Sequence, residues 1–312
     1  MKQHGGNEMD YLLSTNCLTK KFKEQKAVNE VSLHIKQGDI YGFIGRNGAG
    51  KTTFLKMISG LSEPTSGEIT LFNYKGKEIR NVLSRIGTLI EAPGIYPSLN
   101  AYENLKLKCI CAGIKKQGYI EDLLKIVGLS DVGKKKAGNF SLGMKQRLGI
   151  AMALVGEPDL LVLDEPINGL DPQGIVEVRD TILKLNKEKN ITIIISSHIL
   201  EELSKIATMY GIIHDGVLIK ELSKEDLLKQ CREHIEIILE HPEAACTVLD
   251  GMGISDYKVI NKQTIHVFEQ LDKSADINFA LADKKIMVNS IRVENEALED
   301  YFIGLTGGAK ND

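Results

Sequence analysis

The sequence contains no tryptophan and is poor in aromatic residues, which make up 5% of its 312 residues. It also has only five cysteines, an odd and scattered set that is poor material for a disulfide framework: Cys17, Cys109, Cys111, Cys231 and Cys246. Cys109 and Cys111 would supply half of a metal site, but no second cysteine or histidine pair completes it, which favours buried helix cysteines. We therefore expect a reducing compartment.

Long apolar runs and a surplus of positive charge are missing as well. No apolar run reaches the roughly 18 residues that a membrane-spanning helix needs. Residues 1–10, MKQHGGNEMD, are polar and contain no apolar signal-peptide segment, so we expect a loose tail. A net charge of -3 argues against a nucleic-acid-binding protein that works by bulk electrostatics. These absences predict a chain that is soluble by itself and leave open its docking on a membrane partner.

The hydrophobic pattern divides the chain into two parts, and its length also suggests two domains. In the first part, short apolar runs alternate with segments of helical spacing. The expected strands are residues 31–36, 40–44, 159–164 and 191–197, with a helix from Lys51 to about Gly60 and several helices within 98–155. Strands that alternate with helices and are buried on both faces predict an α/β fold with a parallel sheet covered by helices on each side.

The second part, residues 221–312, has a different order. Strands are expected at 234–240, 256–262, 264–270 and 285–293, and helices at about 242–252, 273–283 and 295–305. The order β-α-β-β-α-β, followed by a last helix, predicts a small α+β domain of ferredoxin-like type. That fold also occurs in RNA-binding proteins, but this chain has no aromatic-rich strand on which bases could stack.

The segment GRNGAGKT, residues 45–52, matches the pattern G-x-x-x-x-G-K-[ST] and lies between an expected strand and an expected helix. Its glycines let backbone N–H groups turn inward around an anion. The following helix directs its N-terminal dipole at the same place. Lys51 adds a positive charge for the β- and γ-phosphates, and Thr52 offers a hydroxyl to Mg²⁺. We interpret this segment as a phosphate-binding loop.

Two carboxylates end the apolar run LLVLDEP. Asp164 stands at a strand end and is suited to hold Mg²⁺, through water. Glu165 follows, where the end of the strand lets its side chain turn toward the γ-phosphate and polarise an attacking water. A lone Asp-Glu pair at a strand end would otherwise be a helix cap and a surface charge.

The segment NFSLGMKQR predicts a second helix N-terminus suited to an anion, with Ser141 as its N-cap and Gly143 in the first turn. By chemistry alone this assignment is open, because many helices begin with serine.

Taken together, these motifs resemble the nucleotide-binding subunit of an ABC transporter over roughly residues 11–220. GRNGAGKT is similar to the family's Walker A motif, LLVLDE to Walker B and FSLGM to the signature L-S-G-G-Q. NGLD, residues 168–171, resembles the D-loop, and SSH, residues 196–198, the switch histidine. The resemblance implies an α/β P-loop NTPase core (the ABC ATPase core) with an antiparallel β subdomain and a helical subdomain at about 88–155, followed by the small C-terminal α+β domain.

The resemblance also implies an ATPase with ATP and Mg²⁺ as cofactors. Two copies would pair head to tail, so that Ser141 and Gly143 of one copy close on the ATP in the phosphate-binding loop of the other. Glu165 and His198 would be catalytic, and Thr52, Glu91 and Asp164 would serve the metal. The residues expected to bind the nucleotide are Phe22, Val28, Gly45, Arg46, Asn47, Gly48, Ala49, Gly50, Lys51, Thr52, Thr53, Ser141, Gly143 and Asp171. Phe22 stands where the family places an aromatic ring that stacks on adenine; otherwise it would be a core phenylalanine.

The chain departs from the family pattern in two segments. In the signature segment, Leu142 replaces a glycine and Met144 replaces a glutamine. Leucine keeps the backbone N–H of the glycine, so we expect the phosphate contact to persist. Glu91 stands where the family usually has glutamine; a carboxylate there could still serve Mg²⁺, but it adds negative charge beside the γ-phosphate, so we expect altered metal or pH dependence. The loop from Glu91 to Tyr96 would dock on a separate membrane permease.

Glu91, the FSLGMKQR segment and the C-terminal domain resemble one subgroup, the bacterial exporters that protect against bacitracin and lantibiotics. This resemblance implies a cytoplasmic ATPase subunit, peripheral on the inner face of the membrane, that powers export of a peptide antibiotic. Export of a lipid, drug or ion stays an alternative. ABC ATPases that act on nucleic acid or ribosomes usually carry two phosphate-binding loops or long coiled-coil insertions, and this chain has neither. A kinase is disfavoured by the signature segment, and a GTPase by the missing N-K-x-D sequence.

Overall fold

The computed structural model describes residues 11–230, 233–295 and 298–305. Contacts within the chain group it into two compact units, residues 1–224 and 225–312. Strand β11 (Val217–Ser223) belongs to the first unit and crosses the boundary expected at residue 220.

The first unit is built on a six-stranded sheet in the order β11-β10-β4-β9-β8-β7. The strands from β10 to β7 are parallel, and β11 pairs with β10 in antiparallel orientation. Besides β11, its members are β4 (Ile40–Ile44), β7 (Ile86–Leu89), β8 (Leu160–Asp164), β9 (Thr192–Ser197) and β10 (Met209–His214). Strands β4, β8 and β9 are buried along their whole length, which explains why their sequences are continuously apolar.

A second, antiparallel sheet precedes and flanks this one. It contains β1 (Tyr11–Phe22), β2 (Gln25–Val31), β3 (His34–Lys36), β5 (Ser66–Leu71) and β6 (Tyr74–Lys75). The single strand expected at 31–36 is therefore two strands, although Val31, Leu33 and Ile35 are all buried as the alternation predicts. The break has a local cause, because the Thr15 hydroxyl donates to Val31 O and accepts from Leu33 N, at 3.0 and 3.1 Å.

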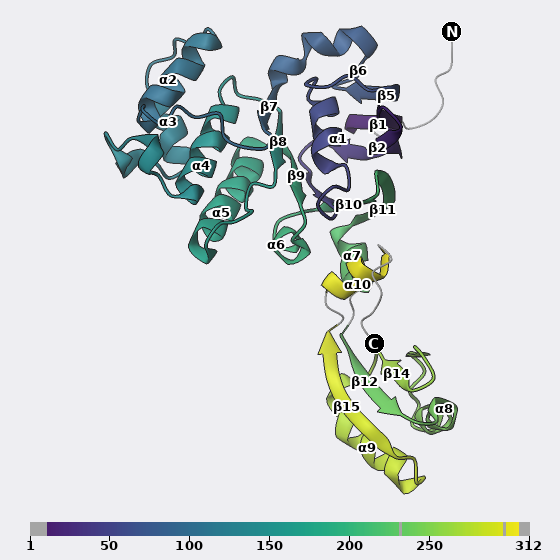
Figure 1. The fold of residues 1–312 in the computed structure, drawn as a ribbon. Helices are drawn as coiled ribbons and strands as arrows, with labels where there is room; N and C mark the ends of the chain where they lie inside the picture. The colour runs from purple at the N-terminus through teal and green to yellow at the C-terminus, as the bar shows by residue number, and fades with distance from the viewer. Residues whose placement is uncertain (1–10, 231–232, 296–297, 306–312) are drawn as a thin grey trace, which may run out of the picture. The chain divides into compact units, whose positions relative to one another are not determined.

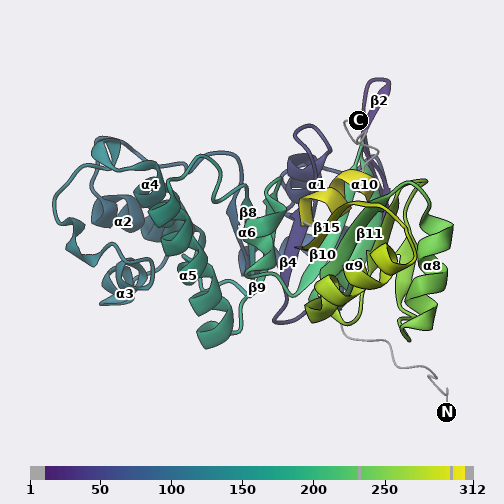
Figure 2. The same ribbon diagram turned by 90° about the horizontal axis from the view of Figure 1, so that it is seen from below.

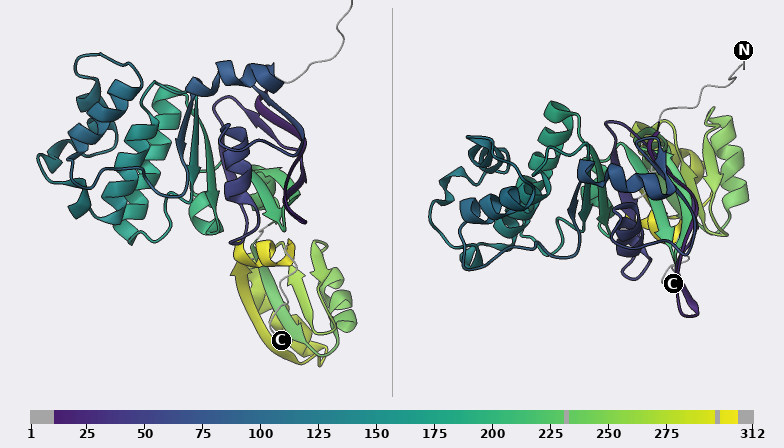
Figure 3. Two further views of the ribbon diagram at one scale, coloured as in Figure 1. Left: turned by 45° about the horizontal axis from the view of Figure 1, so that its top comes forward. Right: turned by 90° about the horizontal axis from the view of Figure 1, so that it is seen from above.

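Helix α1 (Lys51–Ile58) lies between the two sheets and buries Phe54, Leu55 and Met57 in the core that they share (Figure 1). Helix α5 (Pro172–Lys189) covers the opposite face of the six-stranded sheet (Figure 1). The remaining helices of this unit are α2 (Ala101–Cys111), α3 (Tyr119–Ile126), α4 (Leu142–Ala153) and α6 (Leu200–Ser204), with 3₁₀ turns at Gly76–Asn81, Leu83–Arg85, Ser130–Val132 and Ala137–Asn139. Helices α2, α3 and α4 gather beyond α5, away from the antiparallel sheet (Figures 2 and 3).

One of the two cysteines of α2 is buried as expected, and the other is not. Cys109 is buried, which raises the pKa of its thiol, whereas Cys111 is exposed because it lies on the outer side of the last turn. Cys17, Cys109, Cys111 and Cys246 are free thiols, and Cys231 lies outside the described residues.

The second unit contains a four-stranded antiparallel sheet in the order β13-β14-β12-β15. Its elements follow one another as α7 (Lys224–Gln230), β12 (Glu233–Leu239), α8 (Pro242–Gly251), β13 (Tyr257–Val259), β14 (Thr264–Val267), a 3₁₀ turn at Leu271–Lys273, α9 (Ser274–Asp283), β15 (Val288–Asn295) and α10 (Leu298–Leu305). Its own apolar core includes Ile235, Ile237, Leu249, Ile265 and Leu281. Strand β13 is shorter than expected, and β15 begins and ends later.

Candidate functional site: a phosphate-binding loop at the ends of three parallel strands

The loop between β4 and α1 has the backbone that its glycines predict. Gly48 and Gly50 have φ values of 84° and 102°, in the left-handed region that disfavours residues with a side chain. A Cβ atom on Gly50 would lie 2.2 Å from the carbonyl oxygen of Ala27, and one on Gly45 would lie 2.6 Å from that of Ile213. The helix that follows begins at Lys51, as the sequence predicts.

Lys51 is the buried cation of this loop, with only 5% of its surface exposed. Its ammonium group donates to Gly45 O at 2.6 Å and to Arg46 O at 3.2 Å. It also forms an ion pair with Glu165 Oε1 at 3.1 Å. These contacts hold the charge at the N-terminus of α1, where the helix dipole also favours an anion.

Asp164 ends β8 and is held by two hydroxyl groups. Thr52 Oγ1 donates to Asp164 Oδ2 at 2.8 Å, and Ser196 Oγ donates to Asp164 Oδ1 at 2.5 Å. Ser196 lies opposite Asp164 in the parallel pairing of β8 with β9. The sequence places Ser196 within the SSH motif without a role of its own; its position at the end of a neighbouring parallel strand is the signal that could have identified it.

Glu165 turns out of the strand because its backbone is left-handed, with φ of 49°. Its N–H donates to Ser196 Oγ at 2.9 Å. Its carboxylate, in a side chain that is 20% exposed, contacts Lys51 through one oxygen and His198 Nδ1 through the other, the latter at 2.8 Å. The structure thus joins residues from the ends of β4, β8 and β9, which the sequence predicted as separate parts of one site.

An open pocket of about 540 Å³ adjoins this network. Of the residues expected to bind the nucleotide or to be catalytic, those that line it are Phe22, Asn47, Gly48, Gly50, Lys51, Thr52, Thr53 and Glu165. Gln25, Lys26, Ala27, Asp215 and Gly216 line it as well and were not predicted. The Phe22 side chain is 54% exposed, which excludes the alternative that it is a core phenylalanine.

Three of the expected loop residues and Val28 do not line this pocket. The backbone carbonyls of Gly45 and Arg46 bind Lys51, and Ala49 is buried beneath the loop. Val28 is fully buried in the core and does not line this pocket, whose wall is formed here by Gln25, Lys26 and Ala27.

Ser141, Gly143 and Asp171 lie at the junction of α4 and α5, outside the pocket. The Ser141 hydroxyl caps α4 by accepting from Met144 N at 3.2 Å, as predicted. Asp171 caps α5 by accepting from Gly174 N at 3.1 Å. A Cβ on Gly143 would lie 3.4 Å from Gly174 Cα, so this glycine brings the two helices together.

The Glu91 carboxylate lies 2.5 Å from the ammonium group of Lys56. Lys56 is the fourth residue after Thr52 on α1. The carboxylate is directed to this lysine and not to Thr52 or Asp164. Glu91 also has a left-handed backbone, with φ of 65°.

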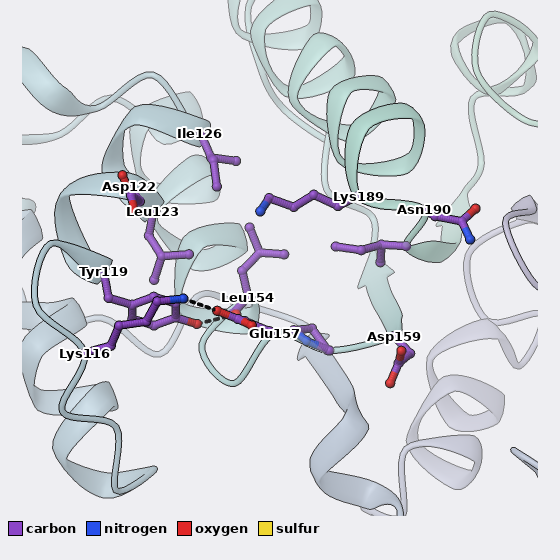
Figure 4. A pocket seen from close by; sticks show the side chains of 12 residues that line it. Lys116, Tyr119, Asp122, Leu123, Ile126, Leu154, Glu157, Asp159, Lys189 and Asn190 are labelled. Atoms are coloured by element: carbon purple, nitrogen blue, oxygen red, sulfur yellow. Dashed lines mark hydrogen bonds and ion pairs between the residues drawn. The ribbon is translucent and has the colours of Figure 1, made fainter.

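A second cavity, of about 360 Å³, lies at the other edge of the six-stranded sheet (Figure 4). It adjoins the segments that precede β8 and β9, whereas the phosphate-binding loop lies at the carboxyl ends of the strands. Lys116 and Glu157 form an ion pair of 3.0 Å on its wall, and burial raises the pKa of Tyr119 beside them (Figure 4). This cavity is separate from the phosphate-binding site.

The oxygen donors near the loop fit a magnesium ion. Within the described part of the chain, no group of three or more His, Cys, Asp or Glu side chains is placed to hold a metal by itself. Mg²⁺ does not need one, because it is usually bound through one or two protein oxygens, waters and substrate phosphates. The hydroxyl of Thr52 and the carboxylate of Asp164 supply donors of that kind.

The described helices include none whose length and apolar character would let it cross a membrane.

The fold and this site define a P-loop nucleotide-binding protein, and comparison with known proteins gives its family. The sequence pattern of the family described as ABC transporter matches residues 28–168. The bacitracin transport ATP-binding protein BcrA of Bacillus licheniformis is 45% identical over 304 residues, which cover 96% of this chain and 99% of that protein. The lantibiotic transport ATP-binding protein SrtF of Streptococcus pyogenes is 44% identical over 211 residues, 67% of this chain and 90% of that protein.

Among solved structures, the dimeric post-hydrolysis state of the ATP-binding cassette MJ0796, bound to ADP and Pi, is similar with a TM-score of 0.61. It is 26% identical, and the match covers 68% of this chain and 98% of that one. The chain belongs to the family of ABC transporter ATP-binding proteins. It is an ATPase subunit with the α/β P-loop core of that family.

Proposed function

We propose that this chain hydrolyses ATP as a homodimer and thereby powers a separate membrane permease that exports a peptide antibiotic. The observation that carries the hydrolysis is the chain of contacts from Lys51 through Glu165 to His198, beside the Thr52–Asp164 pair. It supplies a cation for phosphates and a carboxylate base on the wall of one pocket, with the oxygen donors for a metal on and directly beside that wall.

In this proposal each residue has a distinct role. Lys51 and the backbone N–H groups of the loop bind the β- and γ-phosphates. Thr52 and Asp164 hold Mg²⁺, which when bound neutralises charge on those phosphates. Glu165 accepts the proton of the attacking water. His198 orients Glu165 through the 2.8 Å contact and reaches the γ-phosphate or the water.

The second half of each site comes from the partner copy. Ser141 and Gly143 present the N-terminus of α4, and they do not line the pocket of their own chain. A second copy that placed this helix N-terminus on the triphosphate would complete the pocket. Support comes from MJ0796, whose solved cassette is dimeric. Asp171 would act in the same interface, and Phe22 would stack on adenine.

The domain assignment is also a proposal. Because β11 completes the sheet of the first unit, residues 11–224 would form the ATP-binding domain, with the helical subdomain at about 88–155, and residues 225–312 would contain the ferredoxin-like domain. The sheet order β13-β14-β12-β15 supports the latter. The loop from Glu91 to Tyr96 would dock on the permease and hold the subunit on the inner face of the membrane; Tyr96 is exposed there. Bacitracin and lantibiotic transport by the relatives supports a peptide substrate, and a lipid, drug or ion stays the alternative.

The test is Glu165→Gln, which keeps the size of the side chain and removes its charge. We expect ATP hydrolysis to fall at least 100-fold while nucleotide binding persists, because only the base is lost. The variant should accumulate an ATP-bound dimer, measured by size-exclusion chromatography with and without ATP. In a host that relies on this chain, wild type should restore tolerance to bacitracin-type peptides and the variant should not.

Glu177→Gln is the matched control, since Glu177 pairs with Arg147 on α4 and lies outside the pocket. It should keep wild-type hydrolysis. Wild-type turnover by Glu165→Gln would remove Glu165 as the base. If the variant lost hydrolysis but tolerance to the peptides did not change, peptide export would be excluded and the proposed ATP hydrolysis would stand.

A further inference from the structure

Two side chains on one face of α1 each meet a carboxylate. Thr52 and Lys56 are four residues apart, so they are neighbours on the helix surface. Thr52 donates to Asp164 at the end of β8, and Lys56 pairs with Glu91, which follows β7. Helix α1 is therefore joined at successive turns to two neighbouring strands.

The register of the sheet brings these two contacts to the same edge. Leu89, the last residue of β7, lies opposite Leu163 in the parallel pairing with β8. Asp164 is the next residue after Leu163, and Glu91 is the second after Leu89. The two carboxylates thus belong to adjacent strand ends, one turn of α1 apart.

The charge of Glu91 is compensated where it stands. Its carboxylate and the Lys56 ammonium are 2.5 Å apart, so the pair contributes no net charge to the neighbouring site. The left-handed backbone at Glu91 is unusual for a residue with a side chain, and in this conformation its carboxylate lies on Lys56.

We propose that Lys56 is a positioning residue for the metal site: it holds the Glu91 carboxylate on α1, so that Mg²⁺ must compete with Lys56 for it. This inference deepens the proposed function and rests on the Thr52–Asp164 metal site proposed there. It assigns to Lys56 the control of how strongly the loop after β7 responds to the metal.

The test measures how much Mg²⁺ tightens nucleotide binding. The quantity is the ratio of the ATP dissociation constant in EDTA to that in excess Mg²⁺, from equilibrium titration with a fluorescent ATP analogue. Lys56→Gln should raise this ratio about two- to fivefold, the scale of an exposed ion pair, because it frees a carboxylate for the cation. The shift should shrink at high salt, which screens such pairs. Lys56→Arg, which keeps the charge, should retain the wild-type ratio.

A second background separates this role from a general effect of charge. In a Glu91→Gln chain, Lys56→Gln should produce less than half of the shift, because no carboxylate is left to release. Lys116→Gln is the matched control, as it breaks a comparable lysine–glutamate pair at the opposite edge of the sheet and should leave the ratio unchanged.

An equal shift in both backgrounds, or no shift with Lys56→Gln, would overturn the proposal. A wild-type chain that bound no nucleotide would instead be a failure of the proposed function, so the two failures are distinguishable. Circular dichroism checks that the variants fold, and glutamine is a good helix former at this exposed position.

Discussion

Single residues determine the shape of the phosphate-binding loop, and its two left-handed glycines do so in different ways. Gly50 is close to a neighbouring strand, because its Cα faces the Ala27 carbonyl. Gly48 has a similar φ, but no atom lies within 4 Å of the place that a Cβ would take. The first position needs glycine for space and conformation, and the second for conformation alone.

Gly50→Ala should therefore destabilise the protein more than Gly48→Ala. We expect Gly50→Ala to lower the free energy of unfolding by about 3 kcal/mol or more, since a Cβ would overlap a backbone oxygen. Gly48→Ala should cost about 1–2 kcal/mol from the left-handed backbone alone. Urea denaturation without nucleotide, followed by circular dichroism, measures both. Equal losses would show that the contact with Ala27 carries no energy.

For single residues, the sequence predicted the motif residues of the site better than the residues that surround them. It brought Lys51, Thr52, Asp164 and Glu165 to one place, and hydrogen bonds and ion pairs join them. It gave no role to Lys56, nor to Gln25, Lys26 and Ala27 on the pocket wall. Motif spacing indicates which groups meet a ligand. The carboxylate that a surface lysine pairs with, and the strand residues that line a pocket, are determined by tertiary packing.

At the scale of elements, a partly buried hydrogen bond joins β4 to the edge strand β11. Tyr41 is fully buried, and its hydroxyl donates to Glu221 Oε1 at 2.8 Å. Gly211 leaves room for this ring, since a Cβ there would lie 2.3 Å from the phenol oxygen. Burial and the Glu221 carboxylate raise the pKa of Tyr41 well above its ordinary value. Sequence periodicity predicted β4, but not this cross-sheet contact.

Tyr41→Phe should lower the free energy of unfolding by about 1 kcal/mol at pH 7, because Glu221 loses a buried donor. The raised pKa means that the unfolded chain releases this proton first. The contribution of the Tyr41 hydroxyl to the free energy of unfolding is thus complete below the unfolded-state pKa of about 10. It is lost as the pH rises from there through the folded-state pKa. In urea denaturation, wild type should lose stability more steeply than Tyr41→Phe as the pH rises above about 10, while the difference between the two chains stays constant below that pH. Parallel pH profiles would contradict the assignment.

At the scale of the whole molecule, our proposal has each chain supply two different halves of a site. The pocket with Lys51 and the helix end with Ser141 belong to different parts of the first unit, and Ser141 does not line its own pocket. The sequence alone left the Ser141 helix open as a functional element. The separation of the two halves in one chain is what makes a pair of chains the working unit in our proposal.

Mixing two inactive variants should therefore restore activity. Lys51→Ala removes the cation of the loop, and Ser141→Glu puts a negative charge against the phosphates, while its own helix N-terminus tolerates that charge. Half of the dimers in an equal mixture are mixed and hold one intact site, so about a quarter of the wild-type ATPase activity should return. Steady-state hydrolysis measures it. If the mixture stayed as inactive as its components, the sites would not be shared between chains.

The two hydroxyls on Asp164 bear on the choice of cation. With Thr52 on one oxygen and Ser196 on the other, the carboxylate has little freedom to turn and grip a metal with both oxygens at once. Calcium favours such two-oxygen grips and surrounds itself with about six to eight oxygens, whereas magnesium accepts single oxygens in an octahedron at about 2.0–2.1 Å. If Asp164 holds the metal as proposed, anchoring its carboxylate from both sides would favour small ions, a selectivity that no additional ligand would have to provide.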